Sequence, residues 1–160
     1  PSLLILDEPT SGVDPVSRRS FWDRIYALAL DGVTALVTTH YMDEAEYCHR
    51  VGIMIAGQLR AIGSPDHLRM TTLPWGAWDV RADPLLDALN AVESDLQVLR
   101  GGLSGDHLRV VPAAGADLDA FRNRLEAQGL SRVEVEVVEP SLEDVFLALA
   151  GEESSADTTL

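Results

Sequence analysis

Two adjacent carboxylates and a histidine stand where two parallel strands would end. Asp7 and Glu8 follow the apolar run Leu3–Leu6, and His40 follows the apolar segment Val33–Thr39. Such runs are typical of strands buried on both faces of a parallel sheet. A strand that ends in two carboxylates suits phosphoryl transfer, because one can hold Mg²⁺, often through water, while its neighbour polarises an attacking water molecule.

A helix is predicted between these two runs. Asp14 is suited to the N-cap and Pro15 to the first helical position. Apolar side chains recur at helical spacing over residues 15–30, and Gly32 follows. Because the strands of a β-α-β unit are parallel, their C-terminal ends share one edge of the sheet. The carboxylates and the histidine should therefore meet at that edge, where open α/β sheets bind ligands.

Each of these residues also has a purely structural explanation. An acidic pair at a strand end is usually a solvated turn, and isolated motifs are weak evidence for catalysis. A histidine at a strand end can cap a neighbouring backbone carbonyl. Asp14 has a structural role as an N-cap that a functional role would not replace.

Together, the motifs of residues 1 to about 70 resemble one family in their order and spacing. Residues 3–15, Leu-Leu-Ile-Leu-Asp-Glu-Pro-Thr-Ser-Gly-Val-Asp-Pro, are similar to the Walker B strand and D-loop of ABC-type ATPases. Val13 stands where that family often has leucine. Residues 37–40 (Val-Thr-Thr-His), followed by Asp43-Glu44-Ala45, resemble its switch-histidine loop, or H-loop. Residues 53–65 resemble its closing hairpin, with two strands predicted to join in a type II′ turn at Gly57-Gln58.

This resemblance implies a role for each position. Asp7 would be the Walker B aspartate that serves Mg²⁺ through water. Glu8 would be the general base that polarises the hydrolytic water, and His40 would contact the γ-phosphate of ATP. Ser11 and Asp14 would lie in the D-loop, which reaches across a nucleotide-sandwich dimer. The implied activity is ATP hydrolysis, with ATP and Mg²⁺ as cofactors.

Two elements that ABC ATPases need are absent from these 160 residues. A phosphate-binding loop of the type G-x-x-x-x-G-K-[ST] requires a lysine, and all 12 basic residues are arginine. A signature sequence of the LSGGQ kind should precede the Walker B strand, whereas Leu103-Ser104-Gly105-Asp106 comes far after it and is predicted as a turn. The chain begins at Pro1, without an initiator methionine. We therefore expect the C-terminal portion of an ABC ATPase subunit, inactive by itself.

The second half of the chain has a different pattern. Alternating apolar and polar residues predict strands near 78–82 and 133–137, and residues 96–100 and 108–111 are two further strand candidates. Apolar spacing predicts helices near 85–89 and 118–125. The order β-α-β-β-α-β, followed by a last helix, predicts a small ferredoxin-like domain. Ser141 and Asp144 have the spacing of a capping box at the start of that helix.

The predicted fold class is therefore α/β with two domains and a tail. Residues 1–72 would be the C-terminal half of a P-loop NTPase (ABC-type) parallel-sheet domain. Residues 73–151 would be a small α+β accessory domain of the ferredoxin-like type, and residues 152–160 a disordered tail.

The end of the accessory domain carries a second, shorter resemblance. Residues 139–151, Glu-Pro-Ser-Leu-Glu-Asp-Val-Phe-Leu-Ala-Leu-Ala-Gly, are similar to the C-terminus of ATPase subunits of ABC-2-type exporters, which include drug and antibiotic exporters. The resemblance implies a homodimer of ATPase subunits that pairs with a separate transmembrane permease subunit. It also implies a cytoplasmic protein, peripheral on the inner face of the cell membrane.

The amino-acid composition narrows the classes of protein and partner that fit this chain. Acidic residues outnumber basic ones 26 to 12, and the formal charge of −14 argues against nucleic acid as a partner. The single cysteine excludes an internal disulfide.

Two alternative functions stay open. One is a soluble non-transport ABC ATPase, which the absence of a basic patch disfavours. The other is a non-catalytic binding module, in which Asp7 and Glu8 would be relics.

A cluster of possible metal ligands lies beside the histidine. Its members are His40, Asp43, Glu44, Glu46, Cys48 and His49. At helical spacing one face offers only two candidate ligands, whereas zinc sites usually need at least three. We therefore expect no zinc site here, and Cys48 is predicted to be a small buried residue.

Overall fold

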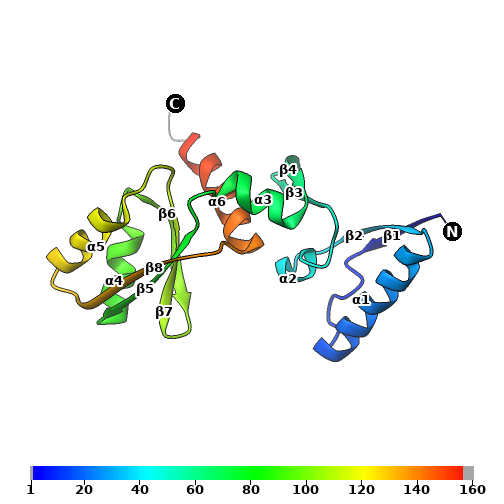
Figure 1. Cartoon of the computed structure of the whole chain (residues 1–160), viewed down its shortest axis with the longest axis horizontal. Coiled ribbons are helices and arrows are strands. Elements are labelled where there is room, and N and C mark those ends of the chain that lie inside the picture. Colours follow the sequence, from blue (N-terminus) through cyan, green and yellow to red (C-terminus); the bar gives the residue numbers. More distant parts are fainter. Residues whose placement is uncertain (1, 157–160) are drawn as a thin grey trace. The chain divides into compact units, whose positions relative to one another are not determined.

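The computed structural model describes residues 2–156, which form a mixed α/β arrangement (Figure 1). The chain divides after His49 into two compact units, here called the N-terminal unit and the C-terminal unit. No helix in the described part of the chain is both long enough and apolar enough to cross a bilayer.

The N-terminal unit is a β-α-β unit with a short additional helix. Its elements are β1 (Leu3–Asp7), α1 (Pro15–Leu30), β2 (Thr34–Thr38) and α2 (Met42–Ala45). β1 and β2 pair in parallel, and Asp7 lies opposite Thr38 in the register. The predicted N-cap is confirmed, because Asp14 Oδ1 accepts the backbone N–H groups of Val16 and Ser17 at 3.0 Å each. The sheet and helix thus bring the two strand ends together as the sequence predicts.

The β1–β2 sheet is covered on one face only within this unit. Trp22 of α1 is buried and stacks on Tyr47, with ring centroids 5.6 Å apart. On the strands, Leu3, Ile5 and Leu36 are 52%, 66% and 57% exposed. The prediction that both faces are buried is therefore wrong for the described residues. Alternating side chains of a strand point to opposite faces, and α1 can cover only one of them.

The C-terminal unit begins with a hairpin and a helix. β3 (Val51–Ile55) and β4 (Gln58–Gly63) are antiparallel, and α3 (Pro65–Thr72) follows. The hairpin turn consists of Ala56 and Gly57, which have φ values of 49° and 76°. Positive φ at both central residues is the pattern of a type I′ turn, which matches the twist of the strands. The predicted type II′ turn at Gly57-Gln58 is therefore wrong by one residue and by type.

A four-stranded antiparallel sheet follows, with strand order β6-β7-β5-β8. Its elements are β5 (Ala77–Asp83), α4 (Leu85–Glu93), β6 (Val98–Ser104), β7 (His107–Pro112), α5 (Leu118–Ala127) and β8 (Ser131–Val138). The order is β-α-β-β-α-β, as the sequence predicts. Gly105 and Asp106 form the turn between β6 and β7, within the segment predicted as a turn.

The core of the C-terminal unit lies between this sheet and the helices α4 and α5. Most of its members are apolar side chains less than a tenth exposed: Trp78, Val80, Ala88, Ala91, Val92, Leu108, Val110, Phe121, Leu125 and Leu130. By the area rule, complete burial of one such aliphatic or aromatic side chain contributes about 1.5–3 kcal/mol. These ten side chains form the apolar core of the C-terminal unit.

The last helix, α6 (Leu142–Ala156), is attached to the sheet by an ion-pair network. Arg109 of β7 lies 2.7 Å from Asp144 and 2.9 Å from Asp79, and Asp144 is buried. Burial alone would lower the pKa of Arg109, but its hydrogen bonds to Asp144 and Asp79 raise it. The predicted capping box is confirmed, because Ser141 N–H donates to Asp144 Oδ2 at 2.7 Å and Asp144 N–H donates to Ser141 Oγ at 3.1 Å.

The sequence predicts a tail that begins at residue 152 and a domain boundary near residue 72. α6 runs to Ala156, so residues 152–156 of the expected disordered tail are helical, and residues 157–160 lie outside the described residues. α3 packs against α6, and residues 50–72 belong to the C-terminal unit. The domain boundary near residue 72 stays a prediction, because compactness alone does not define a domain.

Candidate functional site

The two strand ends are joined through Thr38. The Thr38 hydroxyl donates a hydrogen bond to Asp7 Oδ1. The Glu8 backbone N–H donates to both the Thr38 carbonyl oxygen at 3.1 Å and Thr38 Oγ1 at 3.0 Å. One threonine therefore orients the Asp7 carboxylate and fixes the backbone where Glu8 leaves the strand.

Glu8 and His40 form a direct pair at this edge. His40 Nδ1 lies 3.2 Å from Glu8 Oε2, and each side chain is about half exposed to solvent. Glu8 has a φ of 42°, in the left-handed region that non-glycine residues seldom occupy. The structure thus brings Asp7, Glu8 and His40 to one sheet edge, as the β-α-β arrangement predicts, and leaves the Glu8–His40 pair open to a ligand.

Ser11 and Asp14 lie in the segment that connects this edge to α1. Ser11 N–H donates to the Glu8 carbonyl oxygen at 3.1 Å, which closes a tight turn directly after the pair. Hydrogen bonds from the side chain and backbone of Ser17 hold the pKa of Asp14 below its usual value. Asp14 therefore has the capping role that the sequence predicts, and Ser11 is exposed in the turn.

Glu44 forms a buried polar cluster behind the edge. Its side chain has no exposed surface, and its Oε2 accepts hydrogen bonds from Thr10 Oγ1 at 2.9 Å and Thr39 Oγ1 at 2.7 Å. Arg18 Nε lies 3.3 Å from Glu44 Oε1, an ion pair without the alignment of a hydrogen bond. Burial raises the pKa of the neighbouring Cys48 thiol, and the charge of Glu44 adds to this effect. Cys48 is therefore a poor nucleophile or metal ligand.

The donor set at the edge fits Mg²⁺ but does not form a protein cage for a metal. Asp7 offers an exposed carboxylate beside Glu8, and Mg²⁺ is usually held by one or two carboxylates and several waters. Across the described residues, no three or more histidine, cysteine or acidic side chains are grouped so that they could hold a metal ion. The fit for ATP is incomplete, because these 160 residues contain no lysine for a phosphate-binding loop.

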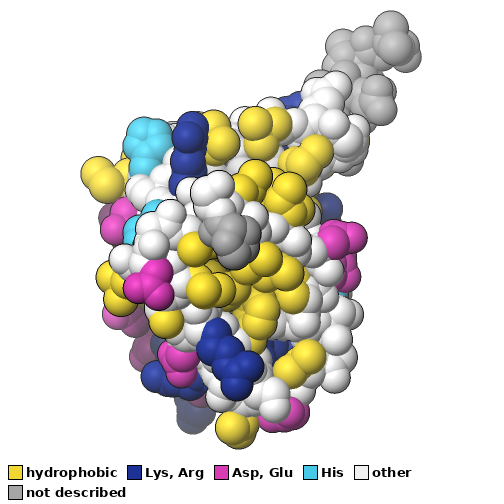
Figure 2. Space-filling view, turned by 90° about the vertical axis from the view of Figure 1, so that its right-hand side faces the viewer, with side chains coloured by type: hydrophobic (Ala, Val, Ile, Leu, Met, Phe, Trp, Pro, Cys, Tyr) yellow, Lys and Arg dark blue, Asp and Glu magenta, His cyan; other side chains and the backbone are white. Residues whose placement is uncertain are grey.

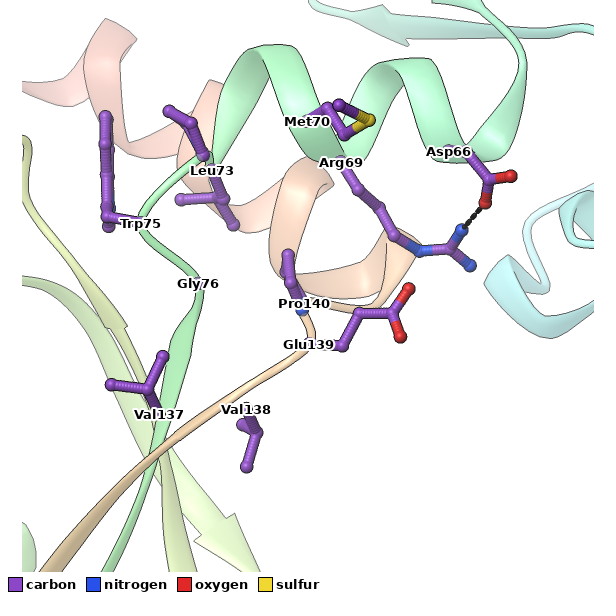
Figure 3. Close-up of a pocket in the computed structure, with 11 residues that line it drawn as sticks. Asp66, Arg69, Met70, Leu73, Trp75, Gly76, Val137, Val138, Glu139 and Pro140 are labelled. Carbon is purple, nitrogen blue, oxygen red and sulfur yellow. Dashed lines mark hydrogen bonds and ion pairs between the residues drawn. The ribbon is translucent and has the colours of Figure 1, made fainter.

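The C-terminal unit contains a separate open pocket of about 630 Å³ (Figure 3). Met70, Leu73 and Trp75 lie on one side of it and Val137 and Pro140 on the other. At its rim Arg69 pairs with Asp66 at 2.8 Å, as the dashed line in the figure marks. The lining is mostly apolar and brings no catalytic set of side chains together, so the sheet edge of the N-terminal unit is the better candidate site.

Comparison with known proteins shows what the chain is similar to. The chain is 51% identical over 87 residues to the probable multidrug ABC transporter ATP-binding protein YbhF of Escherichia coli (strain K12), which covers 54% of the chain and 14% of that protein. It is 35% identical over 159 residues to the Nod factor export ATP-binding protein I of Rhizobium meliloti, which covers 96% of the chain and 44% of that protein. The chain is homologous to the ATP-binding proteins of ABC transporters.

Another relative has a name of the same kind. The ATP-binding cassette sub-family A member 17 of Mus musculus is 44% identical over 70 residues, or 43% of the chain and 4% of that protein. No protein-family model matches the chain. The chain spans about half the length of the Nod factor export proteins and 14% of YbhF. The predicted family resemblance is confirmed, and the roles of single residues in this ABC homologue stay predictions.

Sequence reasoning missed the polar residues that support the site of this ABC homologue. No supporting role is predicted for Thr38, or for Thr10 and Thr39 as partners of one carboxylate, and Glu44 is predicted as part of the H-loop resemblance and as a possible metal ligand. A signal was present, since threonines flank both the carboxylate pair and His40. A threonine hydroxyl can both donate and accept, which suits it to join two strand ends.

Proposed function

We propose that this chain carries the Walker B, D-loop and H-loop residues of the ATP-hydrolysing subunit of an ABC transporter, of the ABC-2 exporter type. The observation that carries this proposal is the Glu8–His40 pair, 3.2 Å apart beside Asp7 at the end of β1. The relatives named above are transport ATP-binding proteins, which favours this function over a soluble non-transport ATPase and over a non-catalytic binding module.

The residues at the edge would divide the chemistry among them. Bound Mg²⁺ supplies positive charge that neutralises phosphate oxygens. Asp7 would hold that ion through water, with its other oxygen fixed by Thr38. Glu8 would accept the proton of the hydrolytic water on Oε1, because Oε2 faces His40. His40 would contact the γ-phosphate through Nε2, because Nδ1 faces Glu8 Oε2.

The proposal extends to the assembly of the transporter. Ser11 and Asp14 would lie at a dimer interface between two ATPase subunits, where the D-loop reaches the partner's nucleotide. The dimer would pair with a separate transmembrane permease subunit on the cytoplasmic, inner face of the membrane, without nucleic acid as a partner. Residues 73–151 would be a ferredoxin-like accessory domain next to the ATPase portion, residues 1–72. Multidrug and Nod factor export belong to the relatives' names, and the substrate of this chain is left open.

The test compares Glu8→Gln with a matched control. In a protein that joins this chain to a phosphate-binding loop and a signature sequence, Glu8→Gln should keep ATP binding and lower the rate of hydrolysis by about 100-fold or more, since general-base catalysis contributes on that scale. The variant should accumulate as an ATP-bound dimer on size-exclusion chromatography. Glu93→Gln, an exposed change of the same type in α4, should hydrolyse ATP like the parent. Near-normal hydrolysis by Glu8→Gln would show that Glu8 is not the base.

The 160 residues alone should hydrolyse no Mg-ATP above background, because they lack the lysine of the phosphate-binding loop. The measurement is phosphate release by the purified chain. Turnover that disappears on Glu8→Gln would overturn this expectation and place the phosphate-binding groups within these residues.

A further inference from the structure

The buried carboxylate of Glu44 joins three segments of the N-terminal unit. Thr10 belongs to the turn after β1, Thr39 directly follows β2, and Arg18 lies in the first turn of α1. All three contact the Glu44 side chain, at distances from 2.7 to 3.3 Å. A buried carboxylate is costly unless it is paired and hydrogen-bonded, so the arrangement depends on all of its partners.

The two threonines flank the Glu8–His40 pair on both chain segments. Thr10 is two residues after Glu8, in the turn that the Ser11–Glu8 hydrogen bond closes. Thr39 immediately precedes His40, and its Oγ1 also accepts the Tyr41 N–H at 3.0 Å. Because one oxygen, Glu44 Oε2, binds both threonines, it fixes the spacing between the turn after Glu8 and the segment that carries His40.

A second path runs through the side chains of Arg18 and Tyr41. The Arg18 guanidinium lies 4.2 Å from the centre of the Tyr41 ring, and the His40 and Tyr41 ring centroids are 4.1 Å apart. Glu44 pairs with this same arginine. The orientation of the His40 ring therefore depends on Glu44 through the backbone at Thr39 and through the Arg18–Tyr41 contact.

We propose that Glu44 is a positioning residue for the Glu8–His40 pair: its carboxylate couples the turn after Glu8 to the end of β2. The catalytic consequence rests on the proposed function, whereas the coupling itself is a property of the folded chain. A residue that only fills space behind the sheet would stabilise the unit without controlling where the His40 ring lies.

The ion pair and the two threonine bonds can be separated by substitution. In Glu44→Gln the amide oxygen can still accept from both threonines, but the amide nitrogen then faces Arg18 Nε, so that two donors oppose each other. Adding Arg18→Met removes the opposing donor and keeps an unbranched apolar side chain. The double variant Glu44→Gln/Arg18→Met restores the acceptor geometry without the charge pair.

The first measurement uses the His40 ring in the 160-residue chain. Its ring proton shifts in ¹H–¹³C NMR spectra report the neighbouring Tyr41 ring, which is tilted by 39° against the imidazole. Glu44→Gln should move these signals toward their positions in the urea-unfolded chain by at least half, and the double variant should restore most of the difference. Thr10→Val should also move them, because Thr10 donates to the same Glu44 oxygen as Thr39. The ring signals of His67, in α3 of the other unit, are the internal control.

The second measurement is steady-state ATP hydrolysis in a protein that joins this chain to a phosphate-binding loop and a signature sequence. Glu44→Gln should lower kcat by about 10-fold, on the scale of a misplaced catalytic group, with KM for ATP within twofold of the parent. The double variant should recover kcat to within threefold. A fall in melting temperature without a change in kcat would overturn the positioning role.

The two measurements separate failure of this inference from failure of the proposed function. His40 ring signals that stay at their parent positions in both Glu44→Gln and Thr10→Val would overturn the coupling, whatever the rate of hydrolysis. Normal hydrolysis by Glu8→Gln would overturn the proposed function, while movement of the His40 signals would still establish that Glu44 couples the two segments.

Discussion

The two units of the chain are stabilised by different kinds of contact. In the C-terminal unit, Val80 and Phe121 are fully buried between a four-stranded sheet and two helices. Among the buried apolar side chains of the described residues, Trp22 and Ala45 are those of the N-terminal unit. The most buried charged group of that unit is Glu44, with its threonine partners. One unit is organised by an apolar core and the other by polar contacts at its sheet edge.

The difference extends to the exposed surface. Leu3, Ile5 and Leu36 leave one face of the β1–β2 sheet apolar and open within its unit. Figure 2, which views the molecule from the right-hand side of Figure 1, shows hydrophobic side chains gathered near the centre of the view. Contiguous exposed apolar surface is uncommon on monomeric proteins. The comparison teaches that the unit with the catalytic residue types has the smaller set of buried apolar side chains.

Removing a large core side chain should produce the largest effect. Phe121→Ala, in α5, should lower the free energy of unfolding of the C-terminal unit by about 3–5 kcal/mol, because it removes buried apolar area and leaves a cavity. The matched change Phe21→Ala, at a half-buried position of α1, should cost clearly less. Urea unfolding followed by circular dichroism measures both. Equal losses would show that the two units do not differ in apolar packing.

A pH-dependent effect of intermediate size is expected at Asp95. Arg124 donates to its carboxylate from Nε at 2.7 Å, and the Gln97 N–H donates at 2.8 Å. Burial alone would raise the pKa of Asp95, but these hydrogen bonds outweigh it and lower the pKa. A carboxylate with a lowered folded-state pKa stabilises the protein above its unfolded value, about 3.9, and this contribution is lost as the pH falls through the folded value.

Asp95→Asn should therefore lower the free energy of unfolding by about 1–2 kcal/mol at pH 7, on the scale of hydrogen bonds to a charged group. The difference from the parent should shrink as the pH falls below about 4. Urea unfolding at pH 7, 5 and 3 measures it. Asp119→Asn, in an exposed i,i+3 pair with Arg122, should change stability by less than about 0.5 kcal/mol at each pH. A difference for Asp95→Asn that does not depend on pH would contradict the assignment.

Local patterns in the sequence were sufficient to predict several features. The Asp14 N-cap, the Ser141–Asp144 capping box and the meeting of Asp7, Glu8 and His40 at one edge all depend on short-range spacing or on the parallel pairing of two strands. The order of strands and helices in the C-terminal unit follows from alternating and helical periodicities in the same way.

Features that depend on tertiary register could not be predicted. Glu44 and Thr10 are 34 residues apart, and only the folded chain places their oxygens at hydrogen-bond distance. An apolar run such as residues 3–6 indicates a buried strand but does not show how many of its faces are covered. The hairpin turn was misplaced because Ala56 has a positive φ, a conformation that alanine seldom adopts.

The smallest effect is expected at the open face of the β1–β2 sheet. Leu36→Thr should change the free energy of unfolding by less than about 0.5 kcal/mol, because the side chain is mostly in water and threonine suits a strand. The same change at Leu108, fully buried in β7, should cost about 2–5 kcal/mol through lost apolar burial and an enclosed hydroxyl. Urea unfolding of the two variants, followed by amide hydrogen exchange of β2 and β7, compares the loss of stability for the same substitution at an exposed and at a buried position. A loss at Leu36 as large as that at Leu108 would mean that the apolar face of the N-terminal unit is covered in solution, and the contrast between the two units would then disappear.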